Sequence, residues 1–164
     1  MQINETPVRN SGFSAGKFLA RSRQHHPDGR RIVPSDITLG SVLFIQCSEF
    51  IIIEADESSL KYMEQSDMWA ESSIEAITAK LRPYEDSLRD ELVSMRDRAL
   101  EDIPYEEIIA HVKNAGVVLT QQEQLTLCRA MDKSGKKKAK FFRLFRIIGD
   151  VDMFASWGSR ATSA

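Results

Sequence analysis

The sequence predicts an α+β protein in which a β-rich part precedes a helical part. Glycine, proline and β-branched residues are frequent from about residue 9 to 56, a composition that favours turns and strands. After residue 56, glycine and proline become rare and strong helix formers dominate. With 164 residues, of which 42% are hydrophobic, the chain is long enough for one or two small cores.

Two short apolar runs predict a β-hairpin in the first part. Residues 41–46 and 50–54 are rich in valine, isoleucine and phenylalanine, and the polar residues 47–49 separate them. A lone hairpin is marginally stable in water, so these strands are expected to pack on other strands or on a helix. Asp56 and Glu57 follow, where a carboxylate can cap the next helix.

Helices are predicted throughout the second part. Ser72 and Glu75 have the spacing of a capping box and begin a helix that lasts until Pro83. The next helix carries an apolar stripe at helical spacing, formed by Leu88, Leu92, Met95 and Ala99.

The remaining helices have their own start and stop signals. Pro104 is expected in the first turn of one helix, and Gly116 at its end. Thr120 and Glu123 form a second capping box, and a last amphipathic helix is predicted from about 138 to 148.

Composition excludes several classes of function. The formal net charge of −2 gives no electrostatic reason to expect nucleic acid or a membrane surface as partner. The two cysteines lie in different segments, and no signal peptide or spanning segment is apparent, so a soluble intracellular protein is expected. No nucleophile, phosphate loop or metal cluster is visible, so neither enzyme activity nor a cofactor is expected. His25 and His26 are interpreted as exposed loop residues and His111 as structural.

A series of motifs in the first part resembles the DM-ten domain found in ciliary proteins. Its pattern runs roughly N-S-G, G-x-F-L-x-R, a D-L-x-x-G turn, a hairpin and a closing D-x-D-E. The chain carries Asn10-Ser11-Gly12, then Gly16 to Arg21, then Pro34 to Gly40, and Asp56-Glu57 after the hairpin. Cys47 stands where the hairpin turn usually has glycine. The resemblance implies a pleckstrin-homology-like β fold.

The helical part resembles a pair of EF-hands. A calcium loop needs oxygen donors at positions 1, 3, 5 and 12 and glycine at position 6. If Asp132 is position 1 of the second loop, Lys136 stands at position 5, Lys137 at 6 and Arg143 at 12. Cations at two ligand positions disfavour calcium, so this loop is interpreted as one that binds no metal.

The first loop of the EF-hand-like part is degenerate as well. Ile103 is expected to be the residue of the short β-bridge that joins the two loops. This register places Arg96 at position 1, Arg98 at position 3 and Leu100 at position 5, so that only Glu107 at position 12 remains as a ligand. Both hands are therefore interpreted as helix pairs that hold each other without metal.

Together the two parts resemble the C-terminal end of the EF-hand-domain-containing ciliary proteins, also called protofilament-ribbon proteins. Those are longer, contain several DM-ten copies and lie inside ciliary doublet microtubules. The resemblance implies an α+β chain with a truncated pleckstrin-homology-like β domain in residues 1–66, a four-helix degenerate EF-hand pair in residues 72–148 and a C-terminal tail in residues 149–164. Since residues 2–7 look like the second strand of such a domain, an incomplete sheet with an open edge is expected.

The resemblance also implies a function. The expected protein is a non-enzymatic, structural microtubule inner protein of the ciliary or flagellar doublet, located in the cytoskeleton of the axoneme. Its expected partners are the tubulin lattice and other microtubule inner proteins, including longer relatives of the ribbon family, with neither nucleic acid nor membrane. The alternative is a calcium-responsive EF-hand adaptor protein.

Two segments contain candidate partner-binding residues. Lys136, Lys137, Lys138 and Lys140 form a basic run that could contact acidic tubulin, although short charge runs are usually solvated. In the tail, Phe154 and Trp157 could anchor the chain in a groove on a partner, or could equally fold back onto the helical core.

Overall fold

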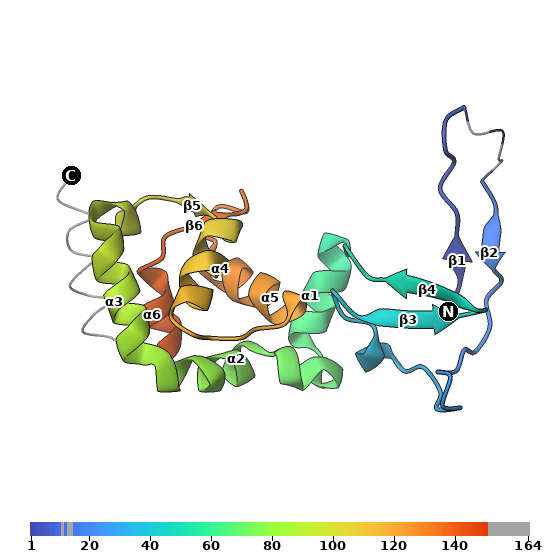
Figure 1. The fold of residues 1–164 in the computed structure, drawn as a ribbon, viewed down its shortest axis with the longest axis horizontal. Coiled ribbons are helices and arrows are strands. Elements are labelled where there is room, and N and C mark those ends of the chain that lie inside the picture. Colours follow the sequence, from blue (N-terminus) through green and yellow to red (C-terminus); the bar gives the residue numbers. More distant parts are fainter. Residues whose placement is uncertain (11, 13–14, 151–164) are drawn as a thin grey trace. The chain divides into compact units, whose positions relative to one another are not determined.

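The computed structural model describes residues 1–10, 12 and 15–150. The chain divides into two compact units, Met1–Glu54 and Ala55–Ala164. Figure 1 shows strands β1 to β4 in the first unit and the helices, with the short strands β5 and β6, in the second. The predicted α+β class is confirmed. Within the described residues, no helix combines the length and apolar character needed to cross a membrane.

Two antiparallel strand pairs form the first unit. Strand β1 (Ile3–Asn4) pairs with β2 (Lys17–Leu19), and β3 (Val42–Ile45) pairs with β4 (Ser48–Ile51). The predicted hairpin is confirmed, with a shorter turn than expected, since residues 48 and 49 belong to β4. Among the described residues each sheet has two strands, so the pleckstrin-homology-like arrangement stays a prediction.

The turn between β3 and β4 explains the unusual residue there. Gln46 and Cys47 have φ angles of 49° and 62°, as in a two-residue type I′ turn, whose twist matches that of the flanking strands. Glycine and asparagine adopt this backbone most readily, so a cysteine here is held in the left-handed region by the pairing of the strands around it.

The core of the first unit is small. Leu19, Leu43 and Ile45 are buried together, and the rings of Phe18 and Phe50 meet edge to face with centroids 5.2 Å apart. Partly buried apolar side chains surround this cluster: Met1, Ile3, Phe18, Ile32, Ile37, Phe50 and Ile52. A 3-10 turn, η1 (Pro34–Asp36), precedes β3.

Helices dominate the second unit, and the described residues between 72 and 148 form five α-helices instead of the predicted four. The α-helices are α1 (Glu57–Gln65), α2 (Ile74–Leu81), α3 (Glu85–Met95), α4 (Tyr105–Asn114), α5 (Gln121–Met131) and α6 (Arg143–Ile148). Short 3-10 turns η2 (Asp67–Ser72), η3 (Arg82–Tyr84) and η4 (Arg96–Leu100) connect some of them, and strands β5 (Ile103–Pro104) and β6 (Lys138–Ala139) pair.

The apolar faces of these helices form one core. The predicted stripe on α3 is confirmed, since Leu88 and Leu92 are fully buried and Met95 nearly so. The largest fully buried side chains of this core are Ile77, Leu81, Leu88, Leu92, Ile108, Val112, Leu127, Met131, Phe141, Leu144 and Phe145. Burial of each such side chain stabilises the fold by roughly 1.5 to 3 kcal/mol before conformational entropy is subtracted.

Most predicted helix ends are confirmed. Thr120 and Glu123 form the expected capping box of α5, and the buried Glu123 also accepts a hydrogen bond from Lys80 of α2. Gly116, with φ of 92°, follows the end of α4. The box of Ser72 with Glu75 is wrong, because Ser72 is still part of η2 and Ser73 caps α2 instead.

Two predicted helix starts lie further along the chain than expected. The last helix begins at Arg143 instead of 138, because Lys138 and Ala139 pair with β5 as a strand. Pro104 precedes the first turn of α4 as its N-cap and has extended backbone angles. Both differences have one cause, which is the short sheet between β5 and β6.

Helix α1 is attached to the helices that follow it. Asp56 caps α1 as predicted, since its Oδ1 accepts hydrogen bonds from the N–H groups of Ser58 and Ser59 at 2.9 and 3.0 Å. On α5, the Arg129 guanidinium donates to Glu57 at 2.7 Å and to Glu64 at 2.5 Å. The second compact unit therefore contains α1, whereas the predicted range 1–66 grouped this helix with the strands.

Replacement of Arg129 tests this attachment. We expect Arg129→Ala to lower the free energy of unfolding by about 1 to 2 kcal/mol, because hydrogen bonds to two carboxylates are lost. The control is Lys61→Ala, since Lys61 lies 3.7 Å from Glu57 with both side chains exposed, and should cost less than about 0.5 kcal/mol. Urea unfolding of both variants measures the difference, and equal values would show that Arg129 does not hold α1.

Candidate functional site

The short sheet joins the two predicted loops at the expected residues. Ile103 lies opposite Ala139 and Pro104 opposite Lys138, antiparallel. Counting from Asp132 as position 1, Ala139 is position 8, and Ile103 has the same position in the first loop. The prediction that Ile103 forms the bridge between the loops is confirmed, and both bridge residues are buried.

The second loop, which begins at Asp132, is held by hydrogen bonds to the carboxylate of that residue. Oδ1 of Asp132 accepts hydrogen bonds from the backbone N–H and the hydroxyl of Ser134, at 2.7 and 2.9 Å, and from the N–H of Gly135 at 2.9 Å. Oδ2 accepts the N–H of Lys137 at 3.0 Å and the Tyr105 hydroxyl at 2.9 Å. Tyr105 stands at the start of α4, so this bond links the second loop to α4.

These contacts shift two pKa values. Burial alone would raise the pKa of Asp132, but the hydrogen bonds from Ser134, Tyr105 and Gly135 outweigh it and lower the pKa to about 2. Burial, together with the bond to Asp132, raises the pKa of the Tyr105 hydroxyl above its usual value. At neutral pH the carboxylate is thus charged and the phenol is a donor.

The second loop does not fit calcium. Lys136 occupies ligand position 5, and Lys137, with φ of 57°, occupies the position where a calcium loop has glycine. At position 12, Arg143 donates to the carbonyl of Met131 at 3.1 Å. The guanidinium therefore holds the end of α5, where a glutamate would bind an ion, and both oxygens of Asp132 already accept hydrogen bonds from the protein.

The first loop closes in a similar way. Arg98, at position 3, lies 2.6 Å from Glu107, at position 12. Glu107 is the one ligand that the sequence retains in this loop, and it is paired with a side chain of the same loop. An ion pair of the protein thus joins two positions that would share a metal in a calcium-binding hand. Across the described residues no group of three or more metal-binding side chains is found.

The histidines have structural partners. His111 lies 2.7 Å from Glu91 and packs on the ring of Phe141, as expected of a structural residue. His25 is exposed as predicted. The prediction of an exposed loop is wrong for His26, which is half-buried and 3.1 Å from Asp36, because the chain folds back at this point.

Cys128 is a buried apolar residue, as predicted. Burial, with a smaller contribution from Glu106, raises the pKa of its thiol to about 12. A thiol with this pKa is not ionised at neutral pH, and the thiolate is the nucleophilic form.

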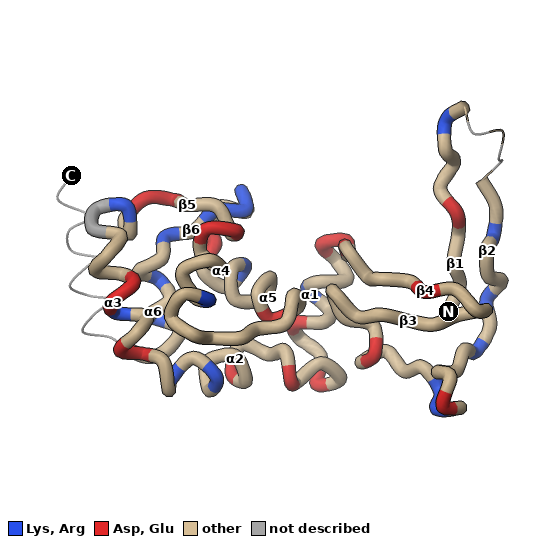
Figure 2. Tube along the Cα trace, viewed as in Figure 1, with Lys and Arg blue, Asp and Glu red and all other residues tan. Residues whose placement is uncertain are grey.

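The predicted basic run lies partly on the second loop. Lys136, Lys137 and Lys138 are exposed and Lys140 is half-buried, and within the described residues they make no ion pair. Figure 2 shows this basic loop beside β6. The other predicted contacts, Phe154 and Trp157, lie outside the described residues. Asp150, the last described residue, forms an ion pair with Arg89 of α3 at 2.8 Å.

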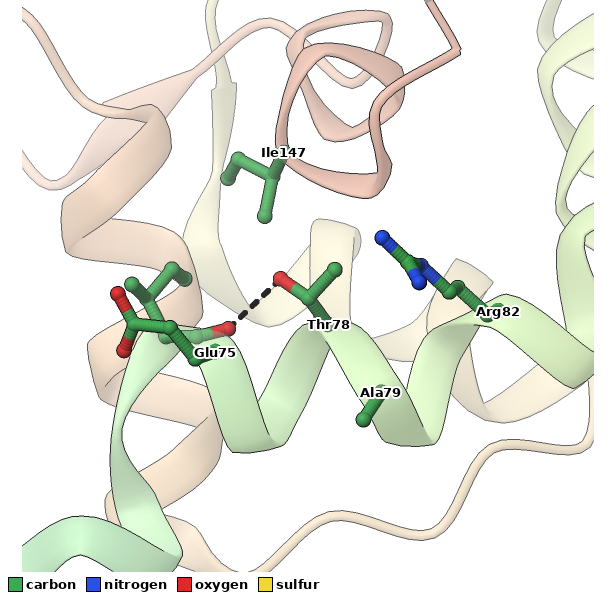
Figure 3. A pocket seen from close by; sticks show the side chains of 6 residues that line it. Glu75, Thr78, Ala79, Arg82 and Ile147 are labelled. Atoms are coloured by element: carbon green, nitrogen blue, oxygen red, sulfur yellow. Dashed lines mark hydrogen bonds between the residues drawn. The ribbon is translucent and has the colours of Figure 1, made fainter.

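One shallow groove lies on the surface of α2. Its volume is about 390 Å³, and its lining side chains are Ile74, Glu75, Thr78, Ala79, Arg82 and Ile147. In Figure 3, Ile147 faces Thr78 across the groove, and the Thr78 hydroxyl donates to the backbone carbonyl of Ile74 at 2.7 Å. The Thr78 hydroxyl is thus engaged with the backbone of its own helix.

Comparison with known proteins found one matching family model and several relatives. The DM10 domain matches residues 1–59. EF-hand domain-containing family member C2 of Danio rerio is 29% identical over 141 residues, which cover 77% of this chain and 19% of that protein. The Bos taurus member C2 is 29% identical over 145 residues, or 79% of this chain and 19% of the relative.

A third relative matches only part of the chain. EF-hand domain-containing protein 1 of Mus musculus is 41% identical over 71 residues, which cover 40% of this chain and 11% of the relative. The chain thus carries a DM10 domain. As the sequence motifs predicted, the chain is similar to EF-hand domain-containing proteins, and it spans about a fifth or less of the length of these relatives.

The Asp132 network gives a prediction with a pH dependence. We expect Asp132→Ala to lower the free energy of unfolding at neutral pH by about 1 to 3 kcal/mol, because five hydrogen bonds are lost. Since the pKa falls from 3.8 unfolded to about 2 folded, this stabilisation is complete above pH 3.8 and lost as the pH falls through about 2.

Urea unfolding at neutral and acidic pH measures both parts of this effect. The matched control is Asp102→Ala, which removes an exposed carboxylate just before β5 and should change little. A difference between wild type and Asp132→Ala that does not shrink in acid would contradict the assigned role of the charged carboxylate.

Proposed function

We propose that this chain is a non-enzymatic, structural protein of the ciliary or flagellar doublet microtubule, where it binds the tubulin lattice and neighbouring ribbon proteins. The proposal rests on its DM10 domain, its similarity to EF-hand domain-containing proteins and the resemblance of its motifs to the ribbon family. The feature of the structure that best supports it is the hairpin of β3 and β4.

The inner face of this hairpin is apolar, and the outer face is largely so. One face carries the buried Leu43 and Ile45 and packs on the small core. The opposite face carries Val42, Phe44 and Ile51, which are 42%, 49% and 57% exposed. On this face Val42 lies directly opposite Ile51, and Phe44 lies opposite the exposed Glu49. Ile53 continues this side of the chain and is 83% exposed.

A face of this kind favours an interaction role. A half-buried antiparallel hairpin usually alternates apolar residues inside with polar residues outside, whereas strands covered on both faces are apolar throughout. Contiguous exposed apolar side chains mark sites of protein contact. We therefore assign the outer face, defined as Val42, Phe44, Ile51 and Ile53, to contact with a neighbouring ribbon protein.

The alternative, a calcium-responsive adaptor, fits the loops poorly. A sensor must present oxygen atoms that are free to bind the ion. Here Asp132 and Glu107 are paired with groups of the protein, and lysine and arginine stand at ligand positions 5 and 12 of the second loop. A helical unit whose loops are held by such protein contacts acts as a rigid spacer or platform.

Retention on axonemes tests the structural role. We expect the wild-type chain to stay with axonemes after a salt wash, and a Phe44→Ser/Ile51→Thr variant to be largely released, because apolar contacts persist in salt. The control is Val118→Thr, which changes an apolar residue of the second unit that is 89% exposed. Release of the wild type as a folded monomer by mild salt would contradict the proposal.

A further inference from the structure

A second, smaller hairpin follows β2. His25 and Arg31 form an antiparallel bridge, flanked by backbone hydrogen bonds from His26 N–H to the Arg30 carbonyl at 2.7 Å and from Ile32 N–H to the Gln24 carbonyl at 3.0 Å. The turn closes through a 2.9 Å hydrogen bond from Gly29 N–H to the His26 carbonyl, with Gly29 at a φ of 86°. We call residues 23–32 the basic hairpin.

The inner side of the basic hairpin is fixed by one carboxylate. Asp36 lies 3.1 Å from His26 and 3.0 Å from the Arg30 guanidinium, and it accepts the N–H of Val33 at 2.8 Å. Ile32 packs on the core of the unit. These contacts engage His26, Arg30 and Ile32, which alternate along the chain with His25 and Arg31.

The outer side carries charges that are not neutralised. Side chains of an antiparallel bridge lie on the same face, and residues two apart along a strand share that face, so Arg23, His25 and Arg31 lie together. All three are exposed, and neither arginine makes an ion pair within the described residues. Figure 2 shows basic positions along this segment after β2. Asp28 is near but lies at the turn, where it accepts the N–H of Arg30.

We propose that the outer face of the basic hairpin, Arg23, His25 and Arg31, binds an extended acidic segment of a partner protein, with carboxylates on alternate residues. Alternate residues of an extended strand are about 6.6 to 6.8 Å apart and lie on one face, so carboxylates at this spacing match basic side chains that share one face of the hairpin. Each guanidinium can hold a carboxylate through two parallel hydrogen bonds. This surface is distinct from the apolar outer face of β3 and β4, and the inference goes beyond the proposed function.

The size of the face favours a polypeptide over nucleic acid. Nucleic-acid sites typically engage 6 to 10 phosphates along a continuous groove. Two arginines and one histidine on a short hairpin are too few for that. Exposed charge pairs are individually weak and screened by salt, so the face adds register and orientation to a larger contact.

The experiment titrates the full chain with a blocked hexapeptide of alternating threonine and glutamate, and with the same peptide carrying glutamine. Amide chemical shifts of residues 23–32 report binding. The glutamate peptide should bind weakly and more weakly as salt rises, and the glutamine peptide should not bind. Arg23→Gln/Arg31→Gln should reduce the affinity for the glutamate peptide at least fivefold. Arg23→Lys/Arg31→Lys keeps both charges, and its affinity should lie between those of the wild type and the glutamine variant.

The matched control, Lys113→Gln/Lys133→Gln, removes two exposed cations from the second unit and should leave the affinity within twofold. Equal loss in this control, or binding of the glutamine peptide, would overturn the proposal. So would tighter, arginine-dependent binding of a short oligothymidylate, which would assign the face to nucleic acid. Unchanged amide shifts outside residues 23–32 show that the variants are folded.

Discussion

The Asp132 carboxylate accepts five hydrogen bonds, and the arrangement of the helical unit depends on them. Four come from the loop that follows and shape it so that Lys138 and Ala139 reach β5. The fifth comes from the hydroxyl of Tyr105, at the start of α4. Pairing of Ala139 with Ile103 then joins the two helix pairs, so that Phe141 and Phe145 enter the common core.

In both loops, groups of the protein thus make the links that a bound ion makes in a calcium-binding EF-hand. In the first loop the link is the ion pair of Arg98 with Glu107, and in the second it is the Asp132 network together with Arg143. Such links are made by protein groups alone and need no bound ion. The helical unit is therefore suited to a constant structural role, and the apolar and basic surfaces of the β-rich unit are suited to contact with partners.

Local patterns in the sequence predicted much of this fold. Capping by Asp56 and Thr120 and the β3–β4 hairpin follow from short-range rules of turn and cap chemistry, and the bridge residue Ile103 follows from the resemblance to a pair of EF-hands. Contacts between distant segments were not predictable, since nothing near Arg129 in the sequence indicates Glu57 and Glu64 as partners. The start of α6 was missed because Lys138 and Ala139 are strand residues only when Ile103 lies beside them.

The most direct test of the account is calcium calorimetry on the full chain, combined with thermal unfolding in excess calcium and in excess chelator. We predict no heat of binding and the same unfolding midpoint in both conditions, because the ligand positions are occupied by groups of the protein. A ligand present at 100 times its Kd stabilises the folded state by about 2.7 kcal/mol, which raises the midpoint of a domain of this size by several degrees. A calcium-dependent rise of that size would contradict the account and support a calcium-responsive adaptor.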